Sequence, residues 1–368
     1  MLAVKRGNEV SAFIRVPACG PSAANTESRT LMQPNEPGRG WSESYLGGSA
    51  ESEERMFRAF ERTIVELQRS MARRGDGTVR RGFHAKGIFS VPRAVFRCAA
   101  QLPAALHVGV FKPNSEYPAA VRFSSSLSDV QPDANRQGHG IAFRITAPEG
   151  AQDVLLSDSP TSHARDAEQF MALADALTSK SRLATIVHLA RRVGIGEAIR
   201  MLRTVLRTST SNMTSMATAS YWSRTPFSFA GTAVRFVMRP HNAAAARAGK
   251  GADYLHEELS RRLAGSDVVF DLAAQLFVDE QRTPIEDGSV EWQESVSPPV
   301  PLGRLTLPRQ DLTSETSRAQ AAQIDGLALT PWNVVGDIQP LGSLNRARKG
   351  VYLASAQARG ATLSAPSR

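Results

Sequence analysis

Short apolar runs separated by turn residues fill residues 82–145, and they constrain the fold more than any other feature. "HVGVFKP", "AAVRFSSS" and "GHGIAFRITAP" alternate there with Pro, Gly, Asn and Asp. The same strand-like pattern returns in "SYWSRTPFSFAGTAVRFVMRP" and "VVFDLAAQLFVDE". Strand-like runs with frequent turn signals are typical of antiparallel sheets. The sequence therefore predicts an antiparallel sheet or barrel as the core of the fold.

Helical spacing dominates the segments that flank these runs. In "ESEERMFRAFERTIVELQRSMARR", residues 51–74, apolar side chains recur at the period of a helix, which predicts an amphipathic helix packed on the body. Further helices are expected in "DAEQFMALADALTS", "SRLATIVHLARRVGIGEAIRMLRTVLRTS", "YLHEELSRRLAG" and "PLGSLNRARKGVYLASAQARG", the last with Ser343 as N-cap and Gly360 as stop. The predicted fold class is α+β, a barrel core with surrounding helices.

The domain organisation predicted from composition is simple. Residues 1–50 are rich in Ser, Gly, Pro and Asn without a sustained period, so we expect a disordered tail. Residues 51–368 contain no internal repeat and no change in composition that would mark a domain boundary, so we expect one domain. Arg15 and Pro17 interrupt the basic N-terminal segment, so no signal peptide is predicted. A cytoplasmic location is expected, with the periplasm as the alternative, and Met32 is an alternative start.

Charge is carried almost entirely by arginine. The chain has a formal net charge of +9, and only six of its cationic residues are lysine. Arginine suits a carboxylate-bearing cofactor, nucleic acid or an anionic surface, because its fork binds oxyanions bidentately. No basic cluster interleaved with aromatics is visible, so no nucleic-acid partner is expected. Two cysteines cannot build a disulfide framework or a metal site alone, and no apolar run approaches the roughly 20 residues of a membrane span.

The segment "RRGFHAKGIFSVP", residues 80–92, places polar residues at the start of an expected strand. His84 follows Arg81 by three residues, and "VRFSSS" supplies Arg122 and Ser124, which share one face of a strand. Buried arginines need anions, so these side chains could converge on one cavity. A surface arginine ladder with a turn serine remains the alternative.

Tyr352 differs from the other tyrosines because Arg348 precedes it by four residues in "RKGVY". Residues i and i+4 share a helix face, and a neighbouring cation favours the phenolate form. A phenolate is the ligand of ferric haem in catalase. Gly350 permits a close backbone approach, which would suit a flat cofactor. The alternative is an ordinary contact between a cation and an aromatic ring.

Together these motifs resemble a known family. "RGFHAKG", "PAAVRFSSS", "GHGIAFRI", "DVLLSDSPTSHARDAEQF", "TPFSF", "FDLAAQLF" and "RARKGVYLASAQAR" are similar, in order, to the haem-binding core of the catalase superfamily over residues 80–360. The resemblance implies a catalase-type barrel and haem b, with its iron, as cofactor. It makes His84 the distal histidine, Ser124 its hydrogen-bonded serine, Tyr352 the iron ligand and Arg348 the partner of that ligand. It assigns Arg81, Arg122 and Arg359 to the haem propionates and Phe170 to stacking over the porphyrin.

The sequence also departs from the family pattern. Asp158 stands where the family has an asparagine that donates a hydrogen bond to peroxide, and an ionised aspartate cannot donate. We expect Asp158 to raise the pKa of a nearby histidine and to weaken dismutation. Phe83 replaces a smaller residue beside His84, and His139 replaces an arginine, with a turn or surface position as an equal alternative. The chain resembles a minimal core without the further domains of larger catalases.

The resemblance implies a haem peroxidase or catalase that reduces hydrogen peroxide or organic hydroperoxides through a ferryl intermediate. Its partners would be a peroxide and a small-molecule electron donor, with peroxidase activity exceeding dismutation; the sequence does not predict an oligomeric state. Three alternatives stay open. They are a hydroperoxide isomerase like the allene oxide synthases, a non-catalytic haem carrier or sensor, and a basic nucleic-acid-binding protein.

Overall fold

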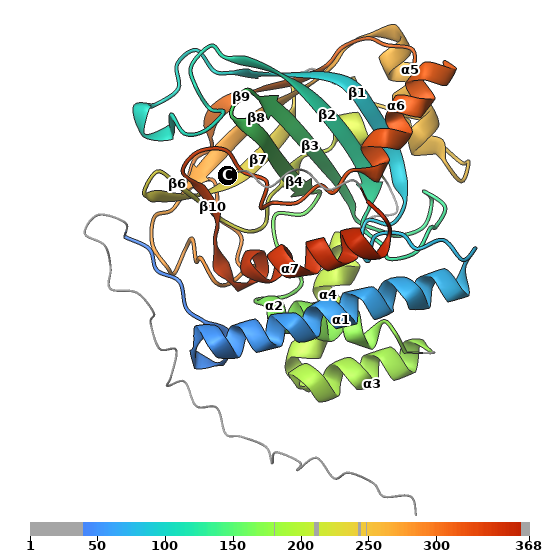
Figure 1. Cartoon of the computed structure of the whole chain (residues 1–368), viewed down its shortest axis with the longest axis vertical. Coiled ribbons are helices and arrows are strands. Elements are labelled where there is room, and N and C mark those ends of the chain that lie inside the picture. The colour runs from blue at the N-terminus through green and yellow to red at the C-terminus, as the bar shows by residue number, and fades with distance from the viewer. Residues whose placement is uncertain (1–39, 180, 210–212, 242–243, 248, 362–368) are drawn as a thin grey trace, which may run out of the picture.

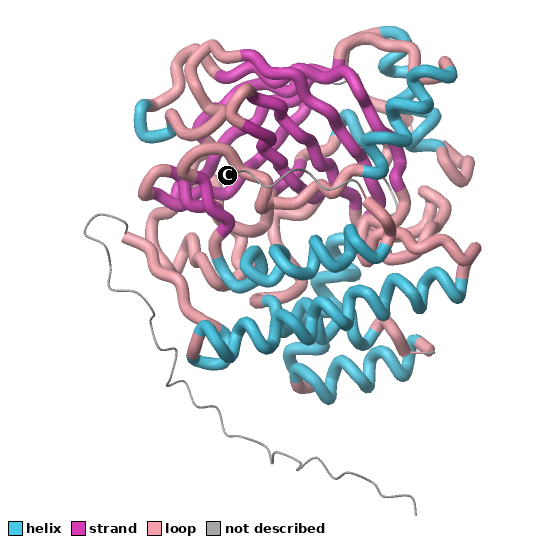
Figure 2. The backbone as a smooth tube through the Cα atoms, viewed as in Figure 1, coloured by secondary structure: helices cyan, strands magenta, loops and turns pink. Residues whose placement is uncertain are grey.

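A computed structural model describes residues 40–179, 181–209, 213–241, 244–247 and 249–361 of the chain. The predicted disorder of residues 1–39 therefore lies outside the described residues. Strands and helices occupy separate layers, with a strand-built body above a slab of helices (Figures 1 and 2). Within the described residues, no helix has the length and apolarity needed to cross a bilayer.

Ten antiparallel strands in the described residues form one sheet in the order β10-β6-β7-β5-β4-β3-β2-β1-β9-β8. An additional pairing of β7 with β8 closes eight of them into a barrel, which confirms the predicted core, while β6 and β10 extend the other edge of β7. The strands are β1 Gly87–Cys98, β2 Glu116–Ser125, β3 His139–Ala147, β4 Gly150–Ser157, β5 Tyr221–Trp222, β6 Phe227–Phe229, β7 Thr232–Pro240, β8 Val268–Leu276, β9 Val300–Leu307 and β10 Ile338–Pro340.

Phenylalanines fill the barrel because alternate residues of each strand point inward. Phe96, Phe143 and Phe270 are fully buried, and Phe111 packs edge-on against Phe96 with ring centroids 5.9 Å apart. Such pairs interdigitate at the density of an organic crystal. The barrel is therefore a packed core, and the open space of the molecule lies outside it.

Seven α-helices of the described residues cover the barrel. They are α1 Ala50–Arg74, α2 Ala167–Ala176, α3 Arg182–Val193, α4 Ile195–Thr208, α5 Tyr254–Gly265, α6 Glu315–Gly326 and α7 Gly342–Ala358. Short 3-10 turns span Leu46–Gly48, Ala104–Leu106 and Met216–Thr218. Helices α1, α2, α3, α4 and α7 gather at one end of the barrel, whereas α5 and α6 lie beside it (Figure 1).

Helix α1 has the predicted amphipathic form. Its Phe60, Ile64 and Leu67 are buried in a cluster with Met171 of α2 and Val351 of α7. Ser49 caps the helix by accepting a hydrogen bond from Ser52 N at 3.2 Å. The result is a three-helix layer that holds α7 against the mouth of the barrel.

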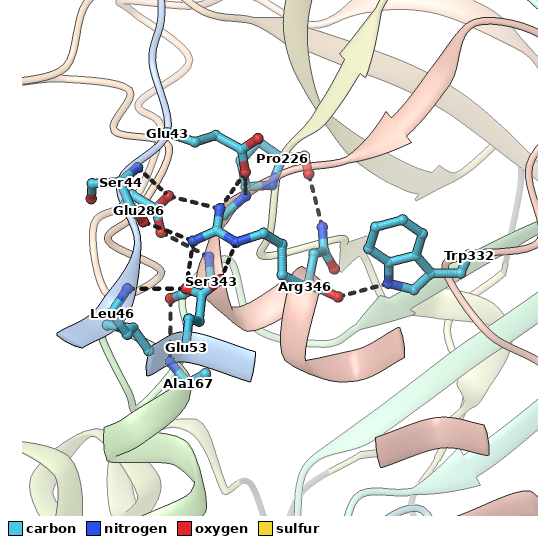
Figure 3. Close-up of polar contacts among 12 residues, drawn as sticks. Glu43, Ser44, Leu46, Glu53, Ala167, Pro226, Glu286, Trp332, Ser343 and Arg346 are labelled. Atoms are coloured by element: carbon cyan, nitrogen blue, oxygen red, sulfur yellow. Dashed lines mark hydrogen bonds and ion pairs between the residues drawn. The ribbon is translucent and has the colours of Figure 1, made fainter. Parts of the chain in front are cut away.

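Helix α7 is anchored by an ionic cluster that we call the Arg346 hub, namely Arg346 with Glu43, Glu53 and Glu286 (Figure 3). Glu53 binds the guanidinium through both its oxygens at 2.8 Å, and Glu286 lies 3.0 Å away. Glu43 and Glu286 also accept the backbone N–H groups of Gly342 and Ser343 at 2.7 Å. Burial raises the pKa of Glu43, and Arg346 opposes that shift. The hub thus ties the first turn of α7 to residues 43–53.

Three expectations need correction, two about element boundaries and one about Gly350. Order begins before residue 51, because Trp41 is buried against Ile285 and Leu341 and Glu43 belongs to the hub. Ser343 is not the N-cap, since α7 begins one residue earlier and the Ser343 hydroxyl instead accepts a bond from Ala167 N. Gly350 makes room for Glu61 of α1 rather than for a cofactor. The predicted stop is confirmed, because α7 ends at Ala358 and Gly360 has a φ of 66°.

The hub yields a prediction for stability. Arg346→Met leaves three carboxylates without their shared cation, and we expect the free energy of unfolding to fall by about 3–5 kcal/mol. Arg304→Met is the control, because it removes an exposed pair with Asp271 and should cost under about 1 kcal/mol. Denaturant titration of both variants measures the difference; equal losses would contradict the anchoring role.

Candidate functional site

A cavity of about 1400 Å³ lies between the open end of the barrel and the helix layer. The lining includes all nine residues singled out from the sequence: Arg81, His84, Arg122, Ser124, Asp158, Phe170, Arg348, Tyr352 and Arg359. They come from β2, α2, α7, the position just after α7 and the loops before β1 and after β4. The structure thus brings together residues up to 278 positions apart in the chain, namely Arg81 and Arg359. What each one does there stays a prediction.

His84 lies in the loop before β1 in a left-handed backbone conformation, with a φ of 57°. A non-glycine residue in this region is strained and is held there by its surroundings. Its Nδ1 lies 3.0 Å from Ser124 Oγ on β2. Gly140 of β3, paired with Ser124, leaves room for the ring, because a Cβ there would lie 2.7 Å from His84 Cε1.

The surroundings of His84 keep its imidazole neutral. Loss of hydration, followed by the charges of Arg122, Arg224 and Arg348, lowers the pKa of His84 to about 3. The charged form is disfavoured both by burial and by nearby cations. At neutral pH the ring is therefore a proton acceptor, with Ser124 fixing one nitrogen and the other pointing away from that bond.

Tyr352 is bonded to a cation on its own helix, as its spacing predicted. Arg348 Nη2 donates to Tyr352 Oη at 2.9 Å, and the guanidinium carbon lies 5.0 Å from the ring centroid. Arg348 Nη1 donates to Asn345 Oδ1 at 3.0 Å, and buried Asn345 in turn donates to Pro226 O at 2.8 Å. The phenol oxygen therefore has a positively charged donor that is itself fixed to the barrel.

Arg81, Arg122 and Arg359 form a second group at the cavity, around the C-terminus of α6. Arg122 Nε lies 2.6 Å from Asp325 Oδ1 and Arg81 Nη1 lies 3.7 Å from it, while Arg359 Nη2 donates to Leu327 O at 3.0 Å. Burial, followed by repulsion from the other arginines, lowers the pKa of Arg81 to about 8 and that of Arg359 to about 10.

This group can hold more negative charge than it does. Its one carboxylate, Asp325, is half-exposed; burial raises the pKa of Asp325, but Arg122 and Arg81 outweigh that effect and lower it. Arg359 Nε is buried without a hydrogen-bond partner among the described residues. Three guanidiniums around one carboxylate, with a donor left over, fit a ligand that carries further carboxylates. Haem is such a ligand, and Phe170 offers an aromatic face in the same cavity.

Comparison with known proteins identifies the family. The family model described as Catalase matches residues 69–188. A catalase-related peroxidase from Mycolicibacterium paratuberculosis is 30% identical over 302 residues, which cover 76% of this chain and 88% of that protein. The chain belongs to the catalase superfamily.

Solved structures of catalases share this fold. A fungal catalase superposes with a TM-score of 0.62 at 17% identity, over 76% of this chain and 59% of its own. Catalase A from Saccharomyces cerevisiae gives the same TM-score and identity, over 76% and 61%. This catalase-superfamily chain therefore spans about 60% of the length of those two enzymes. At this identity the likeness concerns the fold alone.

Asp158 does not behave as the sequence predicted for this family member. Its Oδ2 accepts hydrogen bonds from the backbone N of His139 at 2.8 Å and from His139 Nδ1 at 3.1 Å. The expectation that Asp158 raises the pKa of the distal histidine is wrong, because burial, followed by nearby cations, lowers that pKa, and Asp158 binds His139 instead. His139 is fully buried at the start of β3, so the turn or surface position considered for it is also wrong.

The sequence reasoning missed two cavity residues. Arg224, like His84, has a positive φ, 58°; burial lowers its pKa, and its guanidinium donates to the Ser157 hydroxyl. His163 packs against Phe170 with ring centroids 5.0 Å apart, and burial lowers its pKa to about 3. His163 Nε2 has no hydrogen-bond partner among the described residues. His163 lies in the quoted motif "DVLLSDSPTSHARDAEQF", and Arg224 stands one residue before the motif "TPFSF"; in both places a charged or titratable residue amid apolar ones was the available signal.

The neutral state of His84 can be tested by titration. A folded-state pKa of about 3 lies below the unfolded value of about 6.5. The unfolded chain therefore binds a proton first, and stability falls as pH drops through 6.5 towards 3. We expect the imidazole signal of His84, assigned by its loss in His84→Gln, to stay constant between pH 8 and pH 5 in nuclear magnetic resonance spectra. A midpoint near 6.5 would contradict the electrostatic account.

Proposed function

We propose that this chain is a haem-dependent peroxidase that reduces hydrogen peroxide or organic hydroperoxides, with peroxidase activity exceeding dismutation. One observation carries the proposal: the His84–Ser124 pair and the Tyr352–Arg348 pair open onto the same cavity, beside three arginines that have one carboxylate, Asp325, among them. Membership of the catalase superfamily supports it, and the relative from Mycolicibacterium paratuberculosis is described as a catalase-related peroxidase.

Different residues of this chain would bind different parts of the haem. Tyr352 Oη would bind the iron, and Arg348 donates a hydrogen bond to that oxygen from the same helix. Arg81, Arg122 and Arg359 would bind the two propionates, and Phe170 would pack against the porphyrin. The bound haem supplies the electron chemistry that breaks the O–O bond, while the protein supplies ligation, orientation and electrostatics.

His84 moves the proton. Its neutral imidazole accepts the proton of the hydroperoxide on the nitrogen that faces away from Ser124, and then delivers it to the departing oxygen as an alcohol or water forms. Ser124 holds the ring in the required orientation through its contact with Nδ1. A small-molecule donor returns the electrons and the remaining protons, so that hydroperoxide becomes alcohol and water.

We expect donor oxidation to exceed dismutation because of the residues on the His84 side of the cavity. Asp158 is an acceptor already engaged by His139, so it offers no amide-like donor to a second peroxide molecule. The cavity also exceeds the roughly 300–1,000 Å³ of ordinary small-ligand pockets. The haem would take part of that volume, and the remainder would receive the peroxide and the donor.

Haem ligation is tested by Tyr352→Phe. We expect the full chain, expressed with a haem precursor, to show a Soret band with the high-spin ferric pattern of a tyrosinate ligand, and Tyr352→Phe to lose that pattern. Tyr117→Phe serves as control, because Tyr117 is buried in β2 away from the cavity lining. An unchanged absorption spectrum for Tyr352→Phe would reject Tyr352 as the ligand.

Turnover is tested by His84→Gln. Loss of a general acid and base typically costs about a hundred- to ten-thousand-fold in rate, and we expect a loss of this size in donor oxidation by hydroperoxide. Oxygen release from hydrogen peroxide should be slower than donor oxidation in the parent protein. Product analysis with a fatty-acid hydroperoxide would reveal the alternatives. A rearranged product formed without any donor would indicate an isomerase. No turnover at all would indicate a haem carrier.

A further inference from the structure

Helices α3 and α4 form a hairpin whose outer surface is unusual for a soluble protein. The hairpin lies at the edge of the helix layer, with α3 farthest from the barrel (Figure 1). Its inner side packs on α2 through Leu189, Ala198 and Met201, which are buried. The hairpin carries six of the nine large apolar side chains exposed in the described residues, namely Leu183, Ile186, Val187, Ile195, Ile199 and Leu206.

The exposed apolar residues lie in stripes along both helices. Leu183, Ile186 and Val187 follow the i, i+3, i+4 spacing of one face of α3, and Ile195, Ile199 and Leu206 share one face of α4. Leu183 and Ile195 are each 72% exposed. The apolar face of each helix is thus only partly buried against the rest of the protein. A cluster of exposed apolar side chains of this kind marks an interaction surface.

Positive charge borders the same stripes. The two helices contain six arginines and a single acidic residue, Glu197. Arg200 pairs with Glu197 at 2.9 Å, but Arg182, Arg191, Arg192, Arg203 and Arg207 form no ion pair with a described residue. All five are exposed. Helices with an aliphatic face and an arginine-rich polar face bind anionic membrane surfaces.

The surface continues into the mouth of the cavity. Arg182 and Thr185 of α3 and Leu202 and Val205 of α4 line the cavity. Leu183 and Leu206, next to them in sequence, are 72% and 63% exposed. Arg182 and Thr185 lie near the start of α3, and Leu202 and Val205 lie near the end of α4, so both helices border the cavity. Whatever binds the hairpin therefore lies beside the cavity entrance.

We propose that the outer face of α3 and α4 docks the protein on an anionic lipid surface. Resting on the proposed function, this docking would make the substrate a hydroperoxide carried on a lipid acyl chain. Two copies of this chain, paired face to face, would bring the same arginines into opposition. Nucleic acid would leave the aliphatic stripes unused, since single strands bind through aromatic stacking and duplexes through phosphate contacts. A lipid surface satisfies both the charge and the apolar stripes.

Sedimentation with vesicles tests the docking. We expect the full chain to pellet with vesicles of phosphatidylcholine and phosphatidylglycerol in equal parts, and to remain in solution with phosphatidylcholine alone. Arg203→Glu/Arg207→Glu should weaken binding by about tenfold or more. Leu183→Ser/Leu206→Ser should weaken it as well, because the apolar stripes insert. The control is Val278→Ser/Arg309→Glu, which changes an exposed apolar residue and an exposed arginine on the barrel side.

Several outcomes would overturn the docking surface. They are absence of binding to the anionic vesicles, equal binding by all variants, or binding that the serine variant leaves intact. A dimer in light scattering that Leu183→Ser/Leu206→Ser dissociates would assign the face to a second copy instead.

The substrate class is tested separately from the docking. In anionic vesicles that contain phospholipid hydroperoxide, the docking variants should consume the hydroperoxide more slowly than the parent, while all proteins should consume water-soluble tert-butyl hydroperoxide equally. Equal rates on both substrates would overturn the lipid substrate. Vesicle binding without consumption of either hydroperoxide would support the docking surface and reject the proposed function, so the two failures are distinguishable.

Discussion

Uncompensated positive charge beside the cavity is the constraint on which the rest of this structure depends. Arg81, Arg122 and Arg359 share the single carboxylate of Asp325, and burial and mutual repulsion lower the pKa of two of them. A further guanidinium, Arg348, is held against Tyr352. The cost of removing these charges from water is recovered only by anions placed among them. The carboxylates of the proposed cofactor would supply such anions.

The same charge sets the chemistry of His84. Burial, followed by the charges of Arg122, Arg224 and Arg348, lowers the pKa of His84, so residues proposed to hold the cofactor also help to prepare the proton acceptor that the proposed reaction requires. The positions of both His84 and Tyr352 depend on the surrounding fold. Ser124 and Gly140, paired across β2 and β3, fix the imidazole, and the Arg346 hub and α1 fix the helix that carries Tyr352.

Local patterns explain how much of this the sequence could predict. Strand alternation placed Arg122 and Ser124 on one face, and helical spacing paired Arg348 with Tyr352, because both relations are set by the period of a single element. The closed barrel followed from the turn signals and from the resemblance to catalases.

Local patterns could not predict which side chains from distant segments of the chain pair with one another. Asp325 reaches Arg122 from the end of α6, 203 residues away, and Asp158 turns to His139 because β3 and β4 pair there. Glu43 joins the Arg346 hub from a segment whose composition predicted disorder. The positive φ of Arg224 and the cluster of exposed apolar residues on α3 and α4 likewise depend on tertiary packing, which decides what a residue faces.

The central claim is that the arginine group is built for the carboxylates of a porphyrin. Calorimetric titration of the haem-free chain with haem, and in parallel with haem whose propionates are esterified, tests it most directly. The account predicts markedly tighter binding of the free acid, and loss of that preference in Arg359→Gln. Equal affinity for the two porphyrins would contradict it.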